Sequence, residues 1–459
     1  MLQVMAELVM KPRSNQRGMA LLILVFFLAL IVTAYALRSL NPANIKNAQD
    51  KITVAALAEA KEALIGYAIG VNIVGVGPRP GDMLCPDTND DGIAEISCGN
   101  AAGSLPATRL GRLPWKTLGL SDLRDGNGER LWYAVSNNFK SSTRTTCASP
   151  GSAGCLNSDT VGTITLRNTN GTILNNGSTG SGVVAVIFSA GLPITRSDGV
   201  VQDRICGGCT LNPVNYLDIN AGEDNAGFVD STTDGFINGP VTNASGDSIV
   251  NDTMLVITTQ ELMPKLEKRV ANEVLACLKD YALTKSGGLN RQPWAVQMST
   301  YSTFDDVTDT RVGRIPDVTF DQSRSDSSNV MLDTWGASCK IASSSGWWLN
   351  WKDLVFYAVA WDKDPATGVS PACDNNVPND CLTLATPVGN QIFQKVAVMV
   401  AGKKLAGQAR SSTTNKRTLS NYLEGENITT ASGVNPQGED AKFERKPATA
   451  TFNDVVVSY

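Results

Sequence analysis

The feature that most constrains the fold of this chain is an internal repeat. Seven short motifs of the first half recur in the same order in the second half. First copy before second, the matched segments are 64–68 and 278–282, 111–114 and 313–316, 131–135 and 355–359, 147–155 and 373–381, 183–187 and 396–400, 215–218 and 421–424, and 251–252 and 453–454. Because seven collinear matches rarely arise by chance, the sequence predicts two tandem copies of one domain, at 39–258 and 259–459. A single domain over this region is the alternative, but hydrophobic cores rarely grow past ~250–300 residues.

Both copies show the same order of local patterns. Each begins with an amphipathic helix, at about 45–69 and about 260–283, and continues through a cysteine-containing loop region into β-strand patterns. A short strand closes each copy. This order predicts an α+β fold class, with two tandem heads that each consist of a helix packed on an antiparallel sheet.

An uncharged apolar stretch at 19–37 precedes the first copy. At 1.5 Å per residue it is just long enough to span a bilayer, so the sequence predicts a transmembrane helix at 19–38. Lys11, Arg13 and Arg17 precede the stretch and only Arg38 follows closely, which predicts a cytoplasmic N-terminus and an exported remainder. A secretory signal peptide is the alternative, but no small-residue cleavage motif follows the apolar run.

The junction at 16–22, with the sequence QRGMALL, resembles the start of type IV prepilins and type II secretion pseudopilins. The resemblance implies a leader at 1–18, which a prepilin peptidase removes between Gly18 and Met19, and an apolar helix that stays on the mature chain. It also implies a single-pass protein of the bacterial inner membrane with pilin-like heads that are periplasmic, or extracellular after assembly. Its partners would be other pilin or pseudopilin subunits, contacted through the N-terminal helix.

One departure from the family pattern narrows the expected role. Pilins usually carry Glu at the fifth mature position, where this chain has Ile23. Subunits without that Glu resemble tip or initiating subunits, so the resemblance implies a minor structural subunit at or near the tip of a type IV pilus or secretion pseudopilus. The alternative is a membrane-anchored, extracytoplasmic binding module, adhesin-like and stiffened by calcium, that is not built into a filament.

Composition favours a structural role over catalysis. The chain contains no histidine, which excludes Ser-His-Asp and Cys-His mechanisms and His-ligated zinc. No spacing singles out a catalytic pair among its 44 acidic residues, and we expect that it is not an enzyme. The net charge is −5, and the basic stretch at 395–417 lacks interleaved aromatic residues, so no nucleic-acid partner is indicated.

Ten cysteines without histidine are typical of disulfides in an exported protein rather than of a metal knuckle. They are Cys85, Cys98, Cys147, Cys155, Cys206, Cys209, Cys277, Cys339, Cys373 and Cys381. Cys147–Cys155 and Cys373–Cys381 occupy equivalent places in the two copies, which predicts two equivalent disulfides. Cys206 and Cys209 form a C-x-x-C motif between polar loops, where a structural disulfide is favoured over a redox pair.

The motif at 87–92, DTNDDG, has the form of the first half of an EF-hand calcium loop. Asp87, Asn89 and Asp91 alternate as oxygen ligands, Ile93 would add its carbonyl, and Glu95 would add a direct or water-mediated contact. Position twelve is Cys98 instead of the bidentate Glu, so the motif is no EF-hand, although a Cys85–Cys98 disulfide would close the loop. Calcium is therefore the expected cofactor, with a solvated acidic turn as the alternative.

Overall fold

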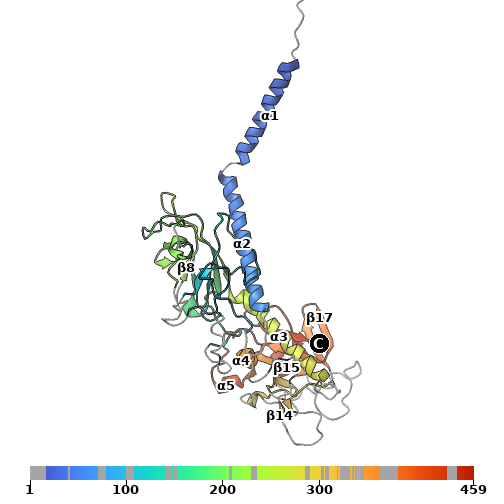
Figure 1. Ribbon diagram of the computed structural model, residues 1–459. Helices are drawn as coiled ribbons and strands as arrows, with labels where there is room; N and C mark the ends of the chain where they lie inside the picture. Colours follow the sequence, from blue (N-terminus) through green and yellow to red (C-terminus); the bar gives the residue numbers. More distant parts are fainter. Residues whose placement is uncertain are drawn as a thin grey trace, which may run out of the picture.

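The computed structural model is elongated, with two halves arranged one after the other and an N-terminal helix that extends away from them (Figure 1). It describes residues 17–39, 42–70, 79–99, 108–140, 147, 154–205, 209–228, 235–284, 290–300, 304, 310–317, 319–320, 331–332, 335, 339, 341, 346–360, 381–431 and 442–459.

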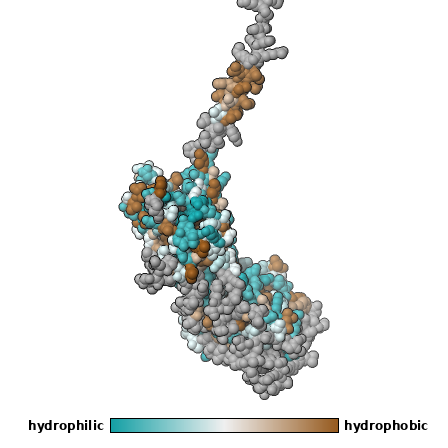
Figure 2. Space-filling model, viewed as in Figure 1, coloured by the Kyte–Doolittle hydropathy of each residue, from teal (hydrophilic) through white to brown (hydrophobic). Residues whose placement is uncertain are grey.

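Two helices form the N-terminal part. α1 (Arg17–Ser39) and α2 (Pro42–Gly70) follow one another nearly end to end, with a bend between them (Figure 1). Pro42 is the first residue of α2, where its missing N–H costs no helical hydrogen bond. Figure 2 shows hydrophobic side chains on the visible face of α1, and Figure 1 shows that α2 runs into the first half.

The prediction of a membrane-spanning helix is wrong. Among the helices in the described part of the chain, none is both long and apolar enough to cross a membrane. The predicted transmembrane segment at 19–38 and the single-pass inner-membrane localisation are corrected accordingly.

Each half contains one four-stranded antiparallel sheet with a helix packed on it. The strand orders are β1-β2-β5-β11 and β12-β15-β18-β20, and the helices are α2 on the first sheet and α3 on the second. The bounds are β1 (Leu110–Arg112), β2 (Trp132–Val135), β5 (Ala185–Ser189), β11 (Thr253–Ile257), α3 (Thr259–Thr284), β12 (Val312–Arg314), β15 (Val355–Val359), β18 (Val396–Val400) and β20 (Val455–Ser458).

The two sheets also share their strand register. Tyr133 of β2 lies opposite Gly111 and Ile187, and Tyr357 of β15 lies opposite Gly313 and Val398. This register places β5 against β18 as Ala185–Ser189 against Val396–Val400, two residues away from the sequence match of 183–187 with 396–400.

A second layer covers the other face of each four-stranded sheet. In each half it includes a three-stranded sheet, ordered β4-β3-β8 in the first half and β17-β16-β19 in the second. The β3·β8 and β16·β19 pairs are parallel. The bounds are β3 (Thr165–Arg167), β4 (Ile173–Asn175), β8 (Gly235–Ile237), β16 (Leu382–Thr386), β17 (Gly389–Gln394) and β19 (Lys442–Glu444).

The remaining described elements are short. They are β6 (Ile219–Asn220), β7 (Glu223–Asp224), β9 (Val241–Thr242), β10 (Ser248–Val250), β13 (Thr319–Phe320), β14 (Met331–Leu332), α4 (Gly346–Trp351), α5 (Thr413–Lys416) and α6 (Glu426–Ala431), with single 3₁₀ turns between them.

The predicted α+β fold class, with one helix on one antiparallel sheet in each head, is therefore wrong. The described residues form a mixed α/β structure with seven small sheets and few helices. The physical reason is that the central strands are buried on both faces and need a second covering layer. Apolar residues within the long polar loops supply it: Leu166 and Phe236 in the first half, and Leu384 and Phe443 in the second.

One hydrophobic core is shared between the halves. Leu57 and Leu64 of α2, Leu266 and Val270 of α3, and one face of each four-stranded sheet belong to a single buried cluster. The helices are also joined at their surfaces, because the Lys61 ammonium lies 2.5 Å from Glu261 and Arg269 Nη1 donates to the Ile69 carbonyl at 3.0 Å. The two halves thus pack as one body.

Candidate functional site

The acidic loop at 87–95 is organised by hydrogen bonds to its own side chains. Asp87 accepts hydrogen bonds from the backbone N–H of Asp90 at 2.7 Å on Oδ1 and of Gly92 at 2.6 Å on Oδ2. Asn89 Oδ1 accepts from the N–H of Asp91 at 3.0 Å, and Asp91 Oδ1 accepts from the N–H of Ile93 at 2.7 Å. Each of the three side chains predicted as ligands thus accepts a hydrogen bond from the backbone of the loop, and Asp87 is buried whereas Asn89 and Asp91 are exposed.

Electrostatics around this loop are mixed. Asp87 is 1% exposed, and burial raises the pKa of its carboxyl despite the backbone N–H groups of Gly92, Asn89 and Asp90. Two basic residues also touch the loop: Lys116 donates to the Asp91 carbonyl and Arg130 Nη1 lies 2.8 Å from Asp90 Oδ1. A bound cation would relieve the cost of burying Asp87 as an anion.

Only some of the predicted oxygen ligands of the acidic loop are placed to bind a cation. Glu95 Oε1 accepts a hydrogen bond from the Thr88 hydroxyl at 2.6 Å, so this carboxylate is occupied within the loop. Among the described residues, no group of three or more His, Cys, Asp or Glu side chains is arranged to hold a metal ion. The oxygens available to calcium are those of Asp87, Asn89 and Asp91 together with the Ile93 carbonyl, and calcium binding stays a prediction.

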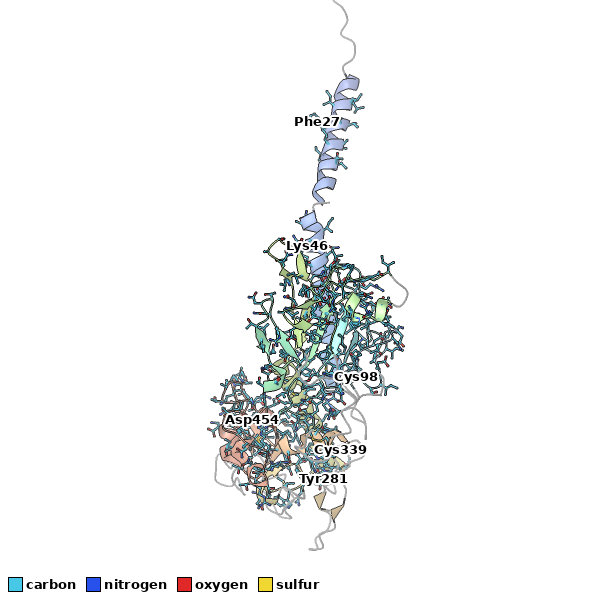
Figure 3. The ribbon with its side chains drawn as sticks, turned by 90° about the vertical axis from the view of Figure 1, so that its left-hand side faces the viewer. Phe27, Lys46, Cys98, Tyr281, Cys339 and Asp454 are labelled. Carbon is cyan, nitrogen blue, oxygen red and sulfur yellow. A yellow bond between two sulfur atoms is a disulfide. The ribbon has the colours of Figure 1, made fainter. Side chains whose placement is uncertain are left out.

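Three disulfides are present in the described part of the chain. Cys85–Cys98 closes the acidic loop, and Cys147–Cys155 closes the segment between these two cysteines, here called the first staple; both disulfides were expected from the sequence. Cys277–Cys339 connects α3 to a residue 62 positions further along the chain (Figure 3). The sequence indicated that both cysteines form disulfides but did not assign their partners. Cys209 begins a 3₁₀ turn and Cys381 directly precedes β16, whereas Cys206 and Cys373 lie outside the described residues.

The predicted cleavage position lies at the start of α1, because Gly18 and Met19 belong to its first turn. Along α1 the large apolar side chains from Leu21 to Val32 are between 47% and 72% exposed. Figure 3 shows the labelled Phe27 pointing away from the helix into open space. The described residues therefore include an apolar helix that the rest of the chain leaves uncovered.

The first half contains a buried carboxyl pair that the sequence analysis did not identify. Asp218 Oδ2 accepts a hydrogen bond from the N–H of Asn251 at 2.7 Å. Asp252 Oδ2 accepts from the N–H of Asp218 and from Nδ2 of Asn225, both at 2.8 Å. Both carboxyl groups are inaccessible to solvent.

The second half repeats this arrangement. Glu424 Oε2 accepts from the N–H of Asn453 at 3.0 Å, and Asp454 Oδ2 accepts from the N–H of Glu424 and from Nδ2 of Asn427, both at 2.9 Å. A Gln-x-Arg triplet supports each pair. Gln202 donates to Asp218 and Gln408 to Glu424, at 2.8 Å and 2.7 Å, while Arg204 and Arg410 lie over the rings of Tyr216 and Tyr422 at 4.6 Å and 4.8 Å. The triplets at 202–204 and 408–410 are the sequence signal for these networks.

Each carboxyl pair favours one bound proton. Burial, followed by the neighbouring Asp218 carboxylate, raises the pKa of Asp252 well above its usual value. Burial, followed by Glu424, does the same to the pKa of Asp454. Oδ1 of both residues is buried without a hydrogen-bond partner among the described residues. Two adjacent carboxyl groups in such surroundings do not both ionise readily.

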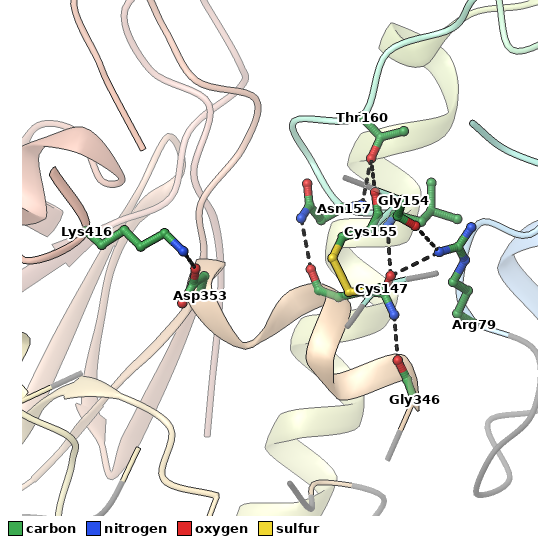
Figure 4. The surroundings of a disulfide bond; sticks show 11 residues. Arg79, Cys147, Gly154, Cys155, Asn157, Thr160, Gly346, Asp353 and Lys416 are labelled. Carbon is green, nitrogen blue, oxygen red and sulfur yellow. Dashed lines mark hydrogen bonds and ion pairs between the residues drawn. A yellow bond between two sulfur atoms is a disulfide. The ribbon is translucent and has the colours of Figure 1, made fainter. Parts of the chain in front are cut away.

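Asn350 joins the halves through its hydrogen bonds to Arg79 and Asn157, two residues that Figure 4 shows beside the first staple. This α4 residue is 1% exposed, and its Oδ1 accepts hydrogen bonds from Arg79 Nη1 at 3.1 Å and from the N–H of Leu156 at 2.8 Å. Its backbone carbonyl accepts from Asn157 Nδ2 at 2.9 Å. Arg79 also forms a buried ion pair with Asp82 at 2.9 Å. The staple loop therefore serves as a docking surface between halves.

Comparison with known protein families, curated protein sequences and solved structures finds no match. The function is therefore inferred from the chain's own residues and geometry.

Proposed function

We propose that this protein is a minor, structural subunit of a type IV pilus or secretion pseudopilus, placed at or near the tip of the filament. The observation that carries the proposal is the uncovered apolar surface of α1, joined end to end to α2 (Figure 2). Burying a large apolar side chain is worth ~1.5–3 kcal/mol, so eleven such side chains in the described part of α1 make association with other apolar helices strongly favourable. The partners in this proposal are the N-terminal helices of other pilin-like subunits.

The body of the molecule supports a terminal rather than a repeated position. The two halves share one hydrophobic core and follow a single N-terminal helix, so each subunit is bulky. The resemblance at 16–22 adds that Ile23 replaces the Glu by which repeated pilins pair with a neighbouring N-terminal amine. A single copy at the end of the filament does not need to fit between identical bulky neighbours, and it does not need the Glu that pairs with a neighbouring amine. This role is structural and requires no catalysis.

Processing by a prepilin peptidase tests the proposal. The intact mass of the chain, co-expressed with such a peptidase, should show the loss of residues 1–18, and Gly18→Phe should block this loss. Gly70→Ala is the matched control because a Cβ at Gly70 meets nothing within 4 Å, and it should be processed normally. Equal processing of Gly18→Phe, or an unprocessed wild-type chain, would contradict the assignment.

A second candidate is an extracytoplasmic binding module, stiffened by calcium, that never enters a filament. The acidic loop favours it, because the loop is closed by the Cys85–Cys98 disulfide and held by backbone hydrogen bonds to Asp87, and rigid loops suit surface recognition. An unprocessed N-terminus together with calcium-dependent stability would favour this candidate over the filament subunit.

A further inference from the structure

A cavity of about 450 Å³ lies where the second half meets the first staple region. Its lining comes from α3, from the segment that follows β18, from the segment that leads into β20, and from Ser158 of the first half. This volume is in the range of sites that hold small organic molecules.

The inner part of the cavity, here called its floor, is rich in carboxyl oxygen atoms. Glu267 of α3 is 3% exposed, and its carboxyl lies against the Ser158 hydroxyl but forms no ion pair with a described residue. Asp454 Oδ1 is buried without a hydrogen-bond partner among the described residues. Buried acceptors without donors are costly, so the floor is suited to a ligand group that carries several N–H donors.

The mouth of the cavity has the opposite charge. Lys403, Lys404 and Lys446 are exposed there and form what we call the rim. Lys446 pairs with Glu444 at 3.0 Å and Lys403 lies 3.4 Å from the Gly180 carbonyl, whereas the Lys404 ammonium has no partner among the described residues. An anionic ligand group would find a free cation at this position.

Between floor and rim the walls are largely apolar. They are formed by Met263, Pro264, Leu405, Ala448 and Val455. This arrangement of acceptors, apolar walls and cations excludes two simpler classes of ligand. The three rim lysines repel a simple cation, and the apolar tail of a fatty-acid anion would contact the Glu267 carboxyl.

We propose that this cavity binds a small zwitterion with an apolar side chain, the chemistry of a free α-amino acid, with its ammonium on the floor at Glu267 and its carboxylate at the Lys404 rim. This site is separate from the proposed filament contacts on α1 and does not depend on them.

The floor predicts a pH dependence of binding. The pKa of Glu267 is raised to about 7, chiefly by burial and also by the neighbouring Asp159 and Glu424, whereas a hydrogen bond from Ser158 and the charge of Arg410 act in the opposite direction. The other charged groups that line the cavity are Asp454 and the three rim lysines. Because ionised Glu267 binds the ammonium, and its ionised fraction rises from about a tenth to about nine tenths between pH 6 and pH 8, affinity should rise about tenfold.

Calorimetric titration of the full-length protein tests the proposal, with L-leucine as the probe. Two analogues dissect it: 3-methylbutylamine lacks the carboxylate and 4-methylpentanoate lacks the ammonium. We expect L-leucine to bind at least tenfold more tightly than either analogue at pH 8. Equal binding of one analogue, or no binding of L-leucine at about 10 mM, would overturn the proposal.

Variants assign the two ends of the ligand. Glu267→Gln should reduce L-leucine affinity and remove its pH dependence, whereas Glu273→Gln, a carboxylate paired with Arg269 on the same helix, should leave both unchanged. Lys404→Ala should bring the affinities of L-leucine and 3-methylbutylamine together. Ala448→Trp tests the location independently of Glu267, since this exposed residue lines the cavity and a large side chain there should block it. Unchanged binding by Ala448→Trp would place the ligand elsewhere.

Discussion

Removing the Asn350 side chain should destabilise both halves of the molecule together. In Asn350→Ala, the N–H of Leu156 loses the acceptor that it has in the native protein, and Arg79 Nη1 loses one acceptor but keeps the Gly154 carbonyl. Leu156 is fully buried and Arg79 is 1% exposed, so water does not replace the lost oxygen at either donor. The Asn157–Asn350 hydrogen bond remains because it uses the backbone carbonyl of Asn350.

The size of the effect follows from the two donors. A buried donor left without a partner costs about 1–3 kcal/mol. Leu156 should contribute this full cost, whereas Arg79 keeps the Gly154 carbonyl at 2.7 Å and its ion pair with Asp82 and should contribute less. We therefore expect the free energy of unfolding to fall by about 2–4 kcal/mol.

Urea unfolding followed by tryptophan fluorescence measures this change, because the buried Trp347 and Trp348 lie on the same short helix as Asn350. Asn170→Ala, in an exposed turn, is the matched control and should change stability by less than about 0.5 kcal/mol. Asn350→Asp keeps an acceptor for both donors and should retain more stability than Asn350→Ala. If Asn350→Ala unfolds at the same urea concentration as the control, the docking role of this residue is refuted.

Three further predictions concern other parts of the molecule. Calcium should stabilise the wild type by about 2.7 kcal/mol at 100 times the dissociation constant and so raise its melting temperature, and Asp87→Ala should abolish the rise in a calorimetric scan. Gly81→Ala should lower the urea midpoint, because Gly81 has φ +97° and a Cβ there would meet Leu156 and Leu266 at 2.9 Å. The pKa of Asp252 is higher in the folded than in the unfolded protein, so the native state keeps its proton to higher pH and wild-type stability falls as pH rises above about 4. Asp252→Asn removes this titrating group and should therefore flatten the dependence of the unfolding free energy on pH. Urea midpoints at pH 4 and pH 8 that differ as much in Asp252→Asn as in wild type would contradict this reasoning.

Local patterns predicted α2, α3 and the central strands, but not the fold class, because the apolar periodicity of these elements is set within short segments. The apolar run before and within β5 did not predict where this strand begins. Val183 leaves the four-stranded sheet to pair with Ile164, so β5 begins at Ala185, two residues after the sequence match began. An apolar run alone does not tell which of two sheets each residue joins.

The second layer and the buried networks depend on contacts that no local pattern contains. Leu166 and Phe236 belong to short apolar segments within polar loops, and they meet only because β3 and β8 pair across 70 residues. Asp218 and Asp252 are typical turn residues by sequence, and their burial follows from the folding of the loops over the sheet. The acidic loop, in contrast, is a local feature, because Asp87, Asn89 and Asp91 accept hydrogen bonds from backbone N–H groups only two to five residues further along.

The short connection between the halves has a mechanical consequence. β11 ends at Ile257 and α3 begins at Thr259, so a single residue links the first sheet to the helix of the second half. That residue, Thr258, is itself held, because its N–H and hydroxyl both donate to Glu261 Oε2 at 3.2 Å in a capping box. When α1 is pulled while the second half is held fixed, this junction therefore contains no flexible linker that could extend. The described part of the molecule then lengthens only if a sheet shears or the shared core opens.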